Sequence, residues 1–341
     1  MRKQVLITLL LFLFIFLVIF FLVLVSGCPY QQYEDPTGEI EFAASEEFIE
    51  DNILLNLQEE YDFMFGRVHE IAIGLTHEAL KAEDVDVAVG FATDGKIKEL
   101  ELVKIEDDKN VFQANHPSPV IREEALEQHQ EIPAIMEEIT PLLDTTTMKE
   151  LNYKVDIEEM TPEEVAHEWL IENNLIDRLS DEREPLIETE TNQEVAGDNR
   201  ETNDKLVISS REFTEQRILG KITVLALKEA GIPVEDRTEV IRTEPIRSAI
   251  MRGQVDMYWD YAGSVWRDIY LQEEVITDAE EIHRRVAQKE ADEGLIWLDY
   301  APLNNTYTVL MRKQDARKEG IETLSDLAEW VKERQKEKER D

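Results

Sequence analysis

The residues best suited to chemistry are concentrated in one short stretch, 256–266 (DMYWDYAGSVW), in which aromatic rings and carboxylates alternate. The segment before it has the pattern of a helix that turns into a strand. Ligands of open α/β sheets bind at the carboxyl ends of the strands. There, the ring of Tyr261 could face a cation while the hydroxyl of Ser264 accepts or donates a hydrogen bond. The alternative is core packing, which is the ordinary fate of the other rings in this stretch, Tyr258, Trp259 and Trp266.

The composition limits the classes of partner that the protein can bind. The chain has 341 residues, enough for two domains with sizeable cores. It carries 75 acidic and 36 basic residues, a formal net charge of -39. A phosphate backbone requires Lys and Arg, so this balance excludes nucleic acid as a partner. A heavily carboxylated surface also suggests a salt-rich environment, in which its self-repulsion is screened.

The N-terminus has the pattern of a secretory signal, predicted over residues 1–28. Arg2 and Lys3 precede an apolar run over 5–25, and small residues follow before Cys28. The Val-Ser-Gly-Cys sequence at 25–28 resembles a bacterial lipobox, and Cys28 is the only cysteine of the chain. We expect Cys28 to be lipidated and residues 29–38 to form a tether, with the protein on the extracellular face of the membrane. An uncleaved membrane anchor is the alternative, because the apolar run is long enough to span a bilayer.

The remainder divides at an acidic linker over 178–204, which is rich in Glu, Asp, Asn and Thr and holds no aromatic residue. Strand-like and helix-like segments alternate on both sides of it, so both 39–177 and 205–341 are predicted to be α/β. Strands are expected at 40–44, 85–91, 100–105, 120–122, 206–210, 235–241, 256–261, 296–298 and toward 310. Helices are expected at 52–65, 75–81, 213–230, 244–252, 278–292 and 323–338, with a helical pattern over 123–175.

The sequence gives little support for an enzyme. The sequence has no Ser/His/Asp or Cys/His arrangement in a supportive context and no phosphate loop. Its six histidines do not have the spacing of metal ligands. The acidic cluster Glu106-Asp107-Asp108 could bind Ca²⁺, but a solvated turn is the favoured interpretation. His77 and His116 are expected to lie in loops or on the surface. We therefore predict a protein without metal or cofactor that binds a ligand and does not transform it.

Several runs together resemble one family, the extracellular glycine betaine/choline-binding proteins of osmoprotectant ABC importers. In the second half the resemblance rests on residues 209–216, 256–264, 297–307 and 324–327. In the first half it rests on residues 93–97, 102–109, 119–122 and 150–156. The resemblance implies a two-lobed periplasmic-binding-protein-like fold of type II, whose lobes close on a ligand by a hinge. It also implies an ABC permease and ATPase as partners.

The order of the two halves departs from the family pattern. The part resembling the family's first half is 205–341, and the part resembling its second half is 39–177. The chain therefore resembles a circular permutant, with the linker joining the former ends, and each part is expected to form one lobe. Chain termini lie on surfaces and often close together, so permutation is tolerated.

The resemblance also implies an aromatic cage for a quaternary ammonium compound. Tyr261 and Tyr307 match two cage tyrosines of one lobe, with Ser264 and Arg211 nearby. On the other lobe, Phe91 matches a cage ring. Asn115 stands where a further Tyr is expected, so the cage keeps about three rings.

One substitution bears on which ligand is bound. Asp51 stands where the family has an Arg that serves the carboxylate of the ligand. We therefore expect choline, or another ligand without a carboxylate, to bind at least as tightly as glycine betaine. Two alternatives remain open: a ligand-sensing lipoprotein of the same fold without transport, and a binder of a different small amine or zwitterion.

Overall fold

The computed structural model describes residues 39–176, 205–239 and 245–338. The expected signal sequence, Cys28, the tether and the acidic linker lie outside these ranges. Within them, no helix combines the length and the apolar character needed to cross a membrane.

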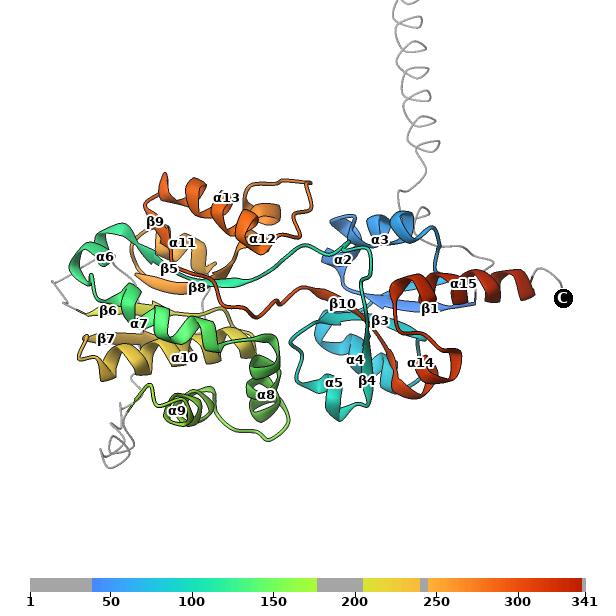
Figure 1. Cartoon of the computed structure of the whole chain (residues 1–341), viewed down its shortest axis with the longest axis horizontal. Coiled ribbons are helices and arrows are strands. Elements are labelled where there is room, and N and C mark those ends of the chain that lie inside the picture. Colours follow the sequence, from blue (N-terminus) through green and yellow to red (C-terminus); the bar gives the residue numbers. More distant parts are fainter. Residues whose placement is uncertain (1–38, 177–204, 240–244, 339–341) are drawn as a thin grey trace, which may run out of the picture.

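The first sheet has the strand order β2-β1-β3-β10-β4. Strand β1 is parallel to β2 and β3, whereas β10 runs antiparallel to β3 and β4 on either side of it. The strands are β1 (Glu41–Ala44), β2 (Arg67–Glu70), β3 (Val87–Phe91), β4 (Leu102–Ile105) and β10 (Tyr307–Arg312). We call this sheet and its helices the first lobe; in Figure 1 it lies on the right.

The second sheet repeats that topology, with the order β7-β6-β8-β5-β9. Strand β6 is parallel to β7 and β8, and β5 is antiparallel to both of its neighbours. The strands are β5 (Pro117–Arg122), β6 (Leu206–Ser209), β7 (Val234–Arg237), β8 (Met257–Tyr261) and β9 (Leu295–Trp297). This sheet and its helices form the second lobe.

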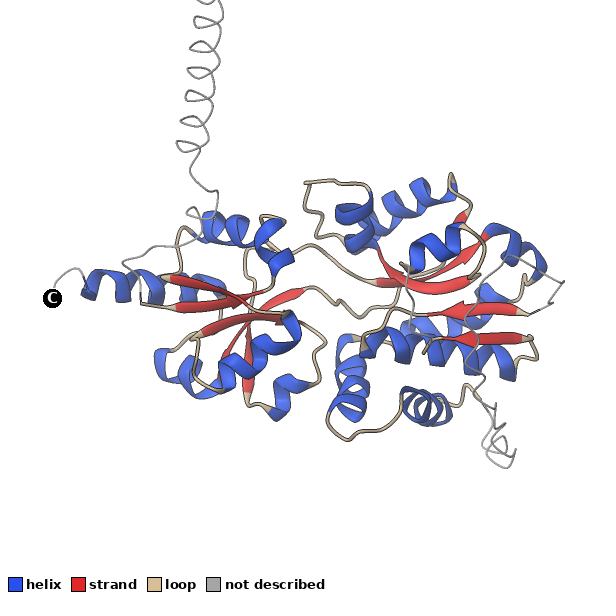
Figure 2. Cartoon of the chain, turned by 180° about the vertical axis from the view of Figure 1, so that it is seen from behind, coloured by secondary structure: helices blue, strands red, loops and turns tan. Residues whose placement is uncertain are grey.

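Helices cover both sheets, as Figure 2 shows from behind. Those of the first lobe are α2 (Glu46–Glu50), α3 (Ile53–Tyr61), α4 (Ile73–Lys81), α5 (Lys96–Glu99), α14 (Lys313–Glu319) and α15 (Leu324–Lys338). Those of the second lobe are α6 (Glu123–Gln128), α7 (Ile132–Ile139), η2 (Thr140–Leu142), α8 (Thr145–Asp156), α9 (Pro162–Glu172), α10 (Thr214–Glu229), α11 (Ile246–Met251), α12 (Ala262–Ser264), η4 (Val265–Ile269) and α13 (Ala279–Ala291). The predicted alternation of strands and helices in both halves is confirmed.

The two halves of the sequence do not correspond to the two lobes, which corrects the expected division at 177 and 205. Strand β10 comes from the second half but lies inside the first sheet, and β5 comes from the first half but lies inside the second. The chain therefore crosses between lobes twice, through 106–116 and 298–306, and these crossing segments run together between the lobes in Figure 1. A pattern of strands and helices in the sequence carries no information on which sheet a strand joins. The sequence therefore could not show that β5 and β10 each belong to the sheet of the other lobe.

Each lobe has its own apolar core. In the first lobe the rings of Phe42 and Phe65 stack with centroids 4.3 Å apart, and Phe48 packs beside Phe42. In the second lobe α10 presents a buried face of Ile218, Leu219 and Ile222 to the sheet, at the spacing of one side of a helix. These cores hold the strand ends that carry the site.

The acidic cluster 106–108 leads into an exposed turn at 108–109, as predicted, and its carboxylates also join neighbouring elements. Asp107 accepts hydrogen bonds from the Tyr61 hydroxyl at 2.7 Å and from the Phe112 backbone N–H at 2.9 Å. Asp108 accepts from the Ser325 hydroxyl at 2.6 Å. These carboxylates hold the start of the first crossing segment against α3 and α15.

The charge of the chain leads to a prediction about stability. With a net charge of -39, the folded protein should be less stable at low ionic strength, because repulsion between like charges is then unscreened. The melting temperature should rise as NaCl is added, in a thermal denaturation series. A melting temperature that stays flat or falls would contradict the salt adaptation.

Candidate functional site

A cleft of about 1080 Å³ lies between the lobes, and both lobes and both crossing segments contribute to its walls. The structure brings all six of the expected ligand-binding residues to this cleft: Phe91, Asn115, Arg211, Tyr261, Ser264 and Tyr307. Asp51 and His77 also line it. His77 is only 3 % exposed, so the expected surface position for it is wrong.

The rings of Phe91 and Tyr307 form one wall. They lie directly opposite each other on the paired strands β3 and β10, and they stack with centroids 5.2 Å apart at 22°. The expectation that Tyr307 shares a lobe with Tyr261 is therefore wrong, because β10 crosses into the first lobe. Burial raises the pKa of Tyr307 to about 12, so its ring stays neutral at physiological pH.

Tyr261 belongs to the opposite wall. It is the last residue of β8, at the carboxyl end of that strand, and it is 2 % exposed. Its hydroxyl donates to Glu215 Oε1 at 2.5 Å. Burial and the neighbouring Glu215 charge raise the pKa of Tyr261. The ring of Phe213 lies 6.3 Å from that of Tyr261, which extends the aromatic surface of this wall.

Glu215 is the buried carboxylate of the cleft, and the sequence interpretation did not select it. Besides Tyr261, its Oε1 accepts from Asn305 Nδ2 at 3.0 Å, and its Oε2 lies 3.4 Å from Asn152 Nδ2. Asn152 also donates to the Thr93 carbonyl at 2.9 Å, which joins the second lobe to the first. Burial raises the pKa of Glu215, and these hydrogen bonds oppose that shift. The one feature of the sequence that could have pointed to Glu215 is its position within 209–216, a run that carries the family resemblance.

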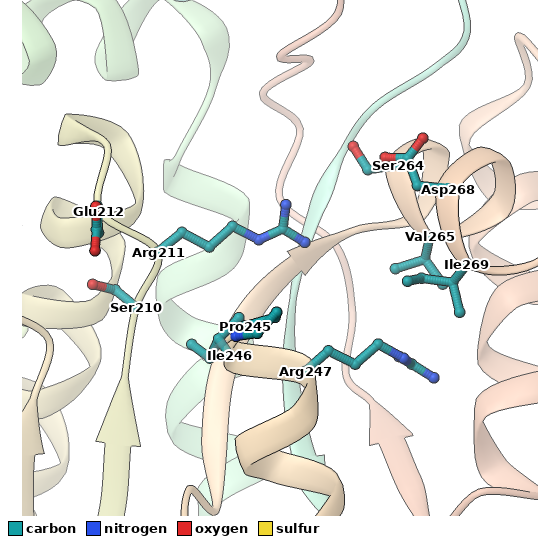
Figure 3. Close-up of a pocket in the computed structure, with 10 residues that line it drawn as sticks. All are labelled: Ser210, Arg211, Glu212, Pro245, Ile246, Arg247, Ser264, Val265, Asp268 and Ile269. Atoms are coloured by element: carbon teal, nitrogen blue, oxygen red, sulfur yellow. The ribbon is translucent and has the colours of Figure 1, made fainter. Parts of the chain in front are cut away.

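Arg211 follows β6 and is held by a buried carboxylate. Its Nη2 donates to Asp260 Oδ1 at 2.5 Å, and the Tyr258 hydroxyl donates to Asp260 Oδ2 at 2.5 Å. The Asp260 charge raises the pKa of Arg211. Arg211 also extends across a smaller pocket of about 430 Å³, opposite Ser264 and Asp268, as Figure 3 shows. The charge of Arg211 is thus largely matched by Asp260.

Asn115 and Ser264 brace the crossing segments. Asn115 Nδ2 donates to the Asn305 carbonyl at 3.0 Å, and its Oδ1 accepts from the Ser264 backbone N–H at 3.0 Å. Gly263 fits this close approach, because a Cβ there would lie 2.5 Å from the Ala114 carbonyl oxygen. Asn115 thus lines the cleft, but both atoms of its side-chain amide already form hydrogen bonds within the protein.

Arg267 is a second residue that the sequence interpretation did not select. It lies in η4, three residues after Ser264, and its Nε is 3.3 Å from Asp51 Oδ2 across the cleft. Its guanidinium carbon is 6.0 Å from the centroid of the Tyr307 ring. The position where an Arg was expected, 51, is therefore a carboxylate that faces an Arg from the other lobe.

The cleft is strongly acidic. Seven carboxylate residues contribute to its lining, against three basic ones. The acidic residues are Glu50, Asp51, Asp94, Asp156, Glu215, Asp268 and Glu273, and the basic residues are Lys96, Arg211 and Arg267. Ring faces beside carboxylates suit a small organic cation that cannot donate hydrogen bonds. Within the described ranges, no group of three His, Cys, Asp or Glu side chains could hold a metal ion.

Comparison with known proteins identifies relatives of this chain. A family model described as the substrate-binding domain of ABC-type glycine betaine transport systems matches residues 31–172 and 204–339. A glycine-betaine-binding protein of Pseudomonas aeruginosa is 35 % identical over 150 residues, which is 43 % of this chain and 48 % of the relative. The carnitine transport binding protein OpuCC of Listeria monocytogenes is 35 % identical over 114 residues, 33 % of this chain and 37 % of the relative.

Among solved structures, a glycine betaine/carnitine/choline ABC transporter chain is 29 % identical, with a TM-score of 0.34 over 40 % of this chain and 50 % of that one. The matched region spans less than half of each of the two curated relatives. The predicted fold class, α/β with two periplasmic-binding-protein-like lobes, is confirmed by the two mixed sheets and the family match.

Proposed function

The chain belongs to the family of substrate-binding domains of ABC-type glycine betaine transport systems, and we propose that it captures a small quaternary ammonium compound between its lobes. The observation that carries this proposal is the pairing of two unlike walls in one cleft. The stacked rings of Phe91 and Tyr307 stand on the first lobe, and Tyr261 with the buried Glu215 stands on the second. A trimethylammonium group offers no N–H, so ring faces and carboxylates are the groups that can hold it.

Transport would require partners outside this chain. We propose that the protein delivers its ligand to an ABC permease and its ATPase, as its family membership suggests. The basic and apolar N-terminal sequence with Cys28 supports secretion and a lipid anchor on the extracellular face. The activity that we propose is ligand capture without chemical change, the activity of a binding protein and not of an enzyme.

We also propose that the chain is a circular permutant. The family model matches in two pieces separated by 173–203, where the acidic linker lies. The described residues on both sides of that linker, α9 and β6, belong to the second lobe, whereas β1 and α15, near the two ends of the chain, belong to the first. Because the two sheets share one topology, either half can begin the chain without a change in strand pairing.

The cage can be tested by removing its rings. Tyr307→Ala or Tyr261→Ala should weaken binding of a quaternary ammonium ligand by about 1–2 kcal/mol, because each change removes a desolvated ring face. Tyr307→Phe should cost less, since the ring remains. The measurement is isothermal titration calorimetry of the purified protein with choline, glycine betaine, carnitine and proline betaine.

Tyr270→Ala is the matched control, because its hydroxyl donates to Glu290 and its ring lies outside the cleft lining. It should leave the affinity unchanged. Unchanged affinity in both cage Ala variants would refute the site.

A further inference from the structure

Arg267 and Asp51 meet across the cleft from different lobes. Asp51 caps the C-terminal end of α2 in the first lobe, and Arg267 lies in η4 of the second. The distance from Arg267 Nε to Asp51 Oδ2 is 3.3 Å, with the side chains 29 % and 38 % exposed. The pair is therefore reachable by a ligand in the cleft.

The pair also lies beside the aromatic wall. The Arg267 guanidinium carbon is 6.0 Å from the Tyr307 centroid, within the range of a cation–π contact, and Tyr307 stacks on Phe91. A ligand whose ammonium group rests on this ring pair would therefore lie beside Arg267. Arg267 and its partners therefore decide which chemical groups are favourable at the other end of the ligand.

Two carboxylates accompany Arg267. Besides Asp51, Asp268 Oδ1 accepts from Arg267 Nε at 2.7 Å. Burial lowers the pKa of Arg267, but the Asp268 hydrogen bond and the nearby negative charges together raise it by more, so the guanidinium remains charged. The positive charge that could attract a ligand carboxylate is therefore offset twice.

We propose that the Asp51–Arg267 pair selects the ligand class, by masking the cation that would otherwise hold the ligand's carboxylate. With Asp51 in place, the cleft favours a quaternary ammonium compound without a carboxylate. Freed from Asp51, Arg267 would pair with a carboxylate and favour a zwitterion. This inference rests on the proposed function, and it adds a residue, Arg267, that decides between two ligand chemistries.

The experiment measures dissociation constants of choline and glycine betaine by calorimetry for the wild type and three variants. Asp51→Asn removes the masking charge and should shift the ratio of affinities toward glycine betaine by about fivefold or more. Arg267→Gln leaves Asp51 without its cationic partner, and the unpaired carboxylate should repel a ligand carboxylate and shift the ratio toward choline by a similar factor. Glu280→Gln is the matched control, because Glu280 is exposed, lies outside the cleft lining and its neutralisation changes the net charge equally.

The outcomes separate the inference from the proposed function. Opposite shifts in the two variants, with the control ratio near that of the wild type, support it, and so does wild-type affinity for choline at least equal to that for glycine betaine. A ratio that stays within twofold in both variants, or that moves as far in Glu280→Gln as in Asp51→Asn, overturns the inference alone. A wild-type preference of tenfold for glycine betaine also overturns it. Failure of the wild type to bind either ligand refutes the proposed function and the inference together.

Discussion

Glu215→Gln should reduce the affinity for a quaternary ammonium ligand by tenfold or more, about 1.4 kcal/mol. The carboxylate is buried in the wall that faces the ligand, and it anchors the Tyr261 hydroxyl at 2.5 Å and Asn305 Nδ2 at 3.0 Å. Gln keeps the shape but removes the negative charge and replaces one acceptor oxygen by a donor. Calorimetric titration with choline measures the effect.

The same residue should make binding and stability respond to pH in opposite directions. Burial raises the pKa of Glu215, so the folded protein takes up this proton at a higher pH than the unfolded chain does. The stability that Glu215 contributes is therefore present in full below the unfolded pKa and is lost as pH rises through the folded pKa. Cation binding needs the carboxylate and should weaken as pH falls through the folded pKa. Both dependences should be absent from Glu215→Gln, when binding and thermal unfolding are followed over a pH series.

Glu212→Gln is the control for this prediction. Glu212 lies three residues earlier, is exposed and lines the smaller pocket, so it changes the net charge by the same amount. It should leave choline affinity within about twofold. Equal losses in the two variants would show that Glu215 acts only through net charge, and an unchanged affinity in Glu215→Gln would remove it from the site.

Gly95→Ala should weaken ligand binding by about 1–3 kcal/mol, the usual cost of forcing a group into a packed contact. Gly95 belongs to the first lobe, and a Cβ there would lie 2.6 Å from the backbone nitrogen of Tyr153 in α8 of the second lobe. Its φ of -64° is ordinary, so the effect comes from the lobe contact and not from backbone strain. Because the atoms that the Cβ would meet belong to the helix backbone, relief requires the lobes to move apart. Calorimetry and small-angle scattering with and without choline measure the loss and the opening.

Gly74→Ala is the matched control, since Gly74 also lines the cleft but a Cβ added there would have no atom within 4 Å. It lies in α4, where Ala should be neutral or slightly stabilising. If Gly95→Ala bound choline as tightly as the wild type does, the contact between Gly95 and α8 would not be needed for ligand binding.

Much of the site could be predicted, because its chemistry is carried by residue types within short runs. Tyr261 at the end of a strand and the hydroxyl of Ser264 followed from local pattern, while Phe91, Tyr307 and Arg211 came from the family resemblance. Glu215 lay inside a run that was already singled out, but a single Glu in an acidic chain gives no sign that it will be buried. Only its contacts with Tyr261, Asn305 and Asn152 distinguish it.

The sequence by itself determined the residue types of the cleft, the alternation of strands and helices, and the strong negative charge. These depend on local spacing and composition, which a linear pattern contains. Tertiary structure alone decided that Tyr307 joins Phe91, because β10 pairs with β3 after the chain has crossed between lobes. It also decided that Asp51 meets Arg267, since that contact joins segments from different lobes and different halves of the chain. Contacts of this kind are set by how two packed cores are placed against each other, and no local sequence pattern records that placement.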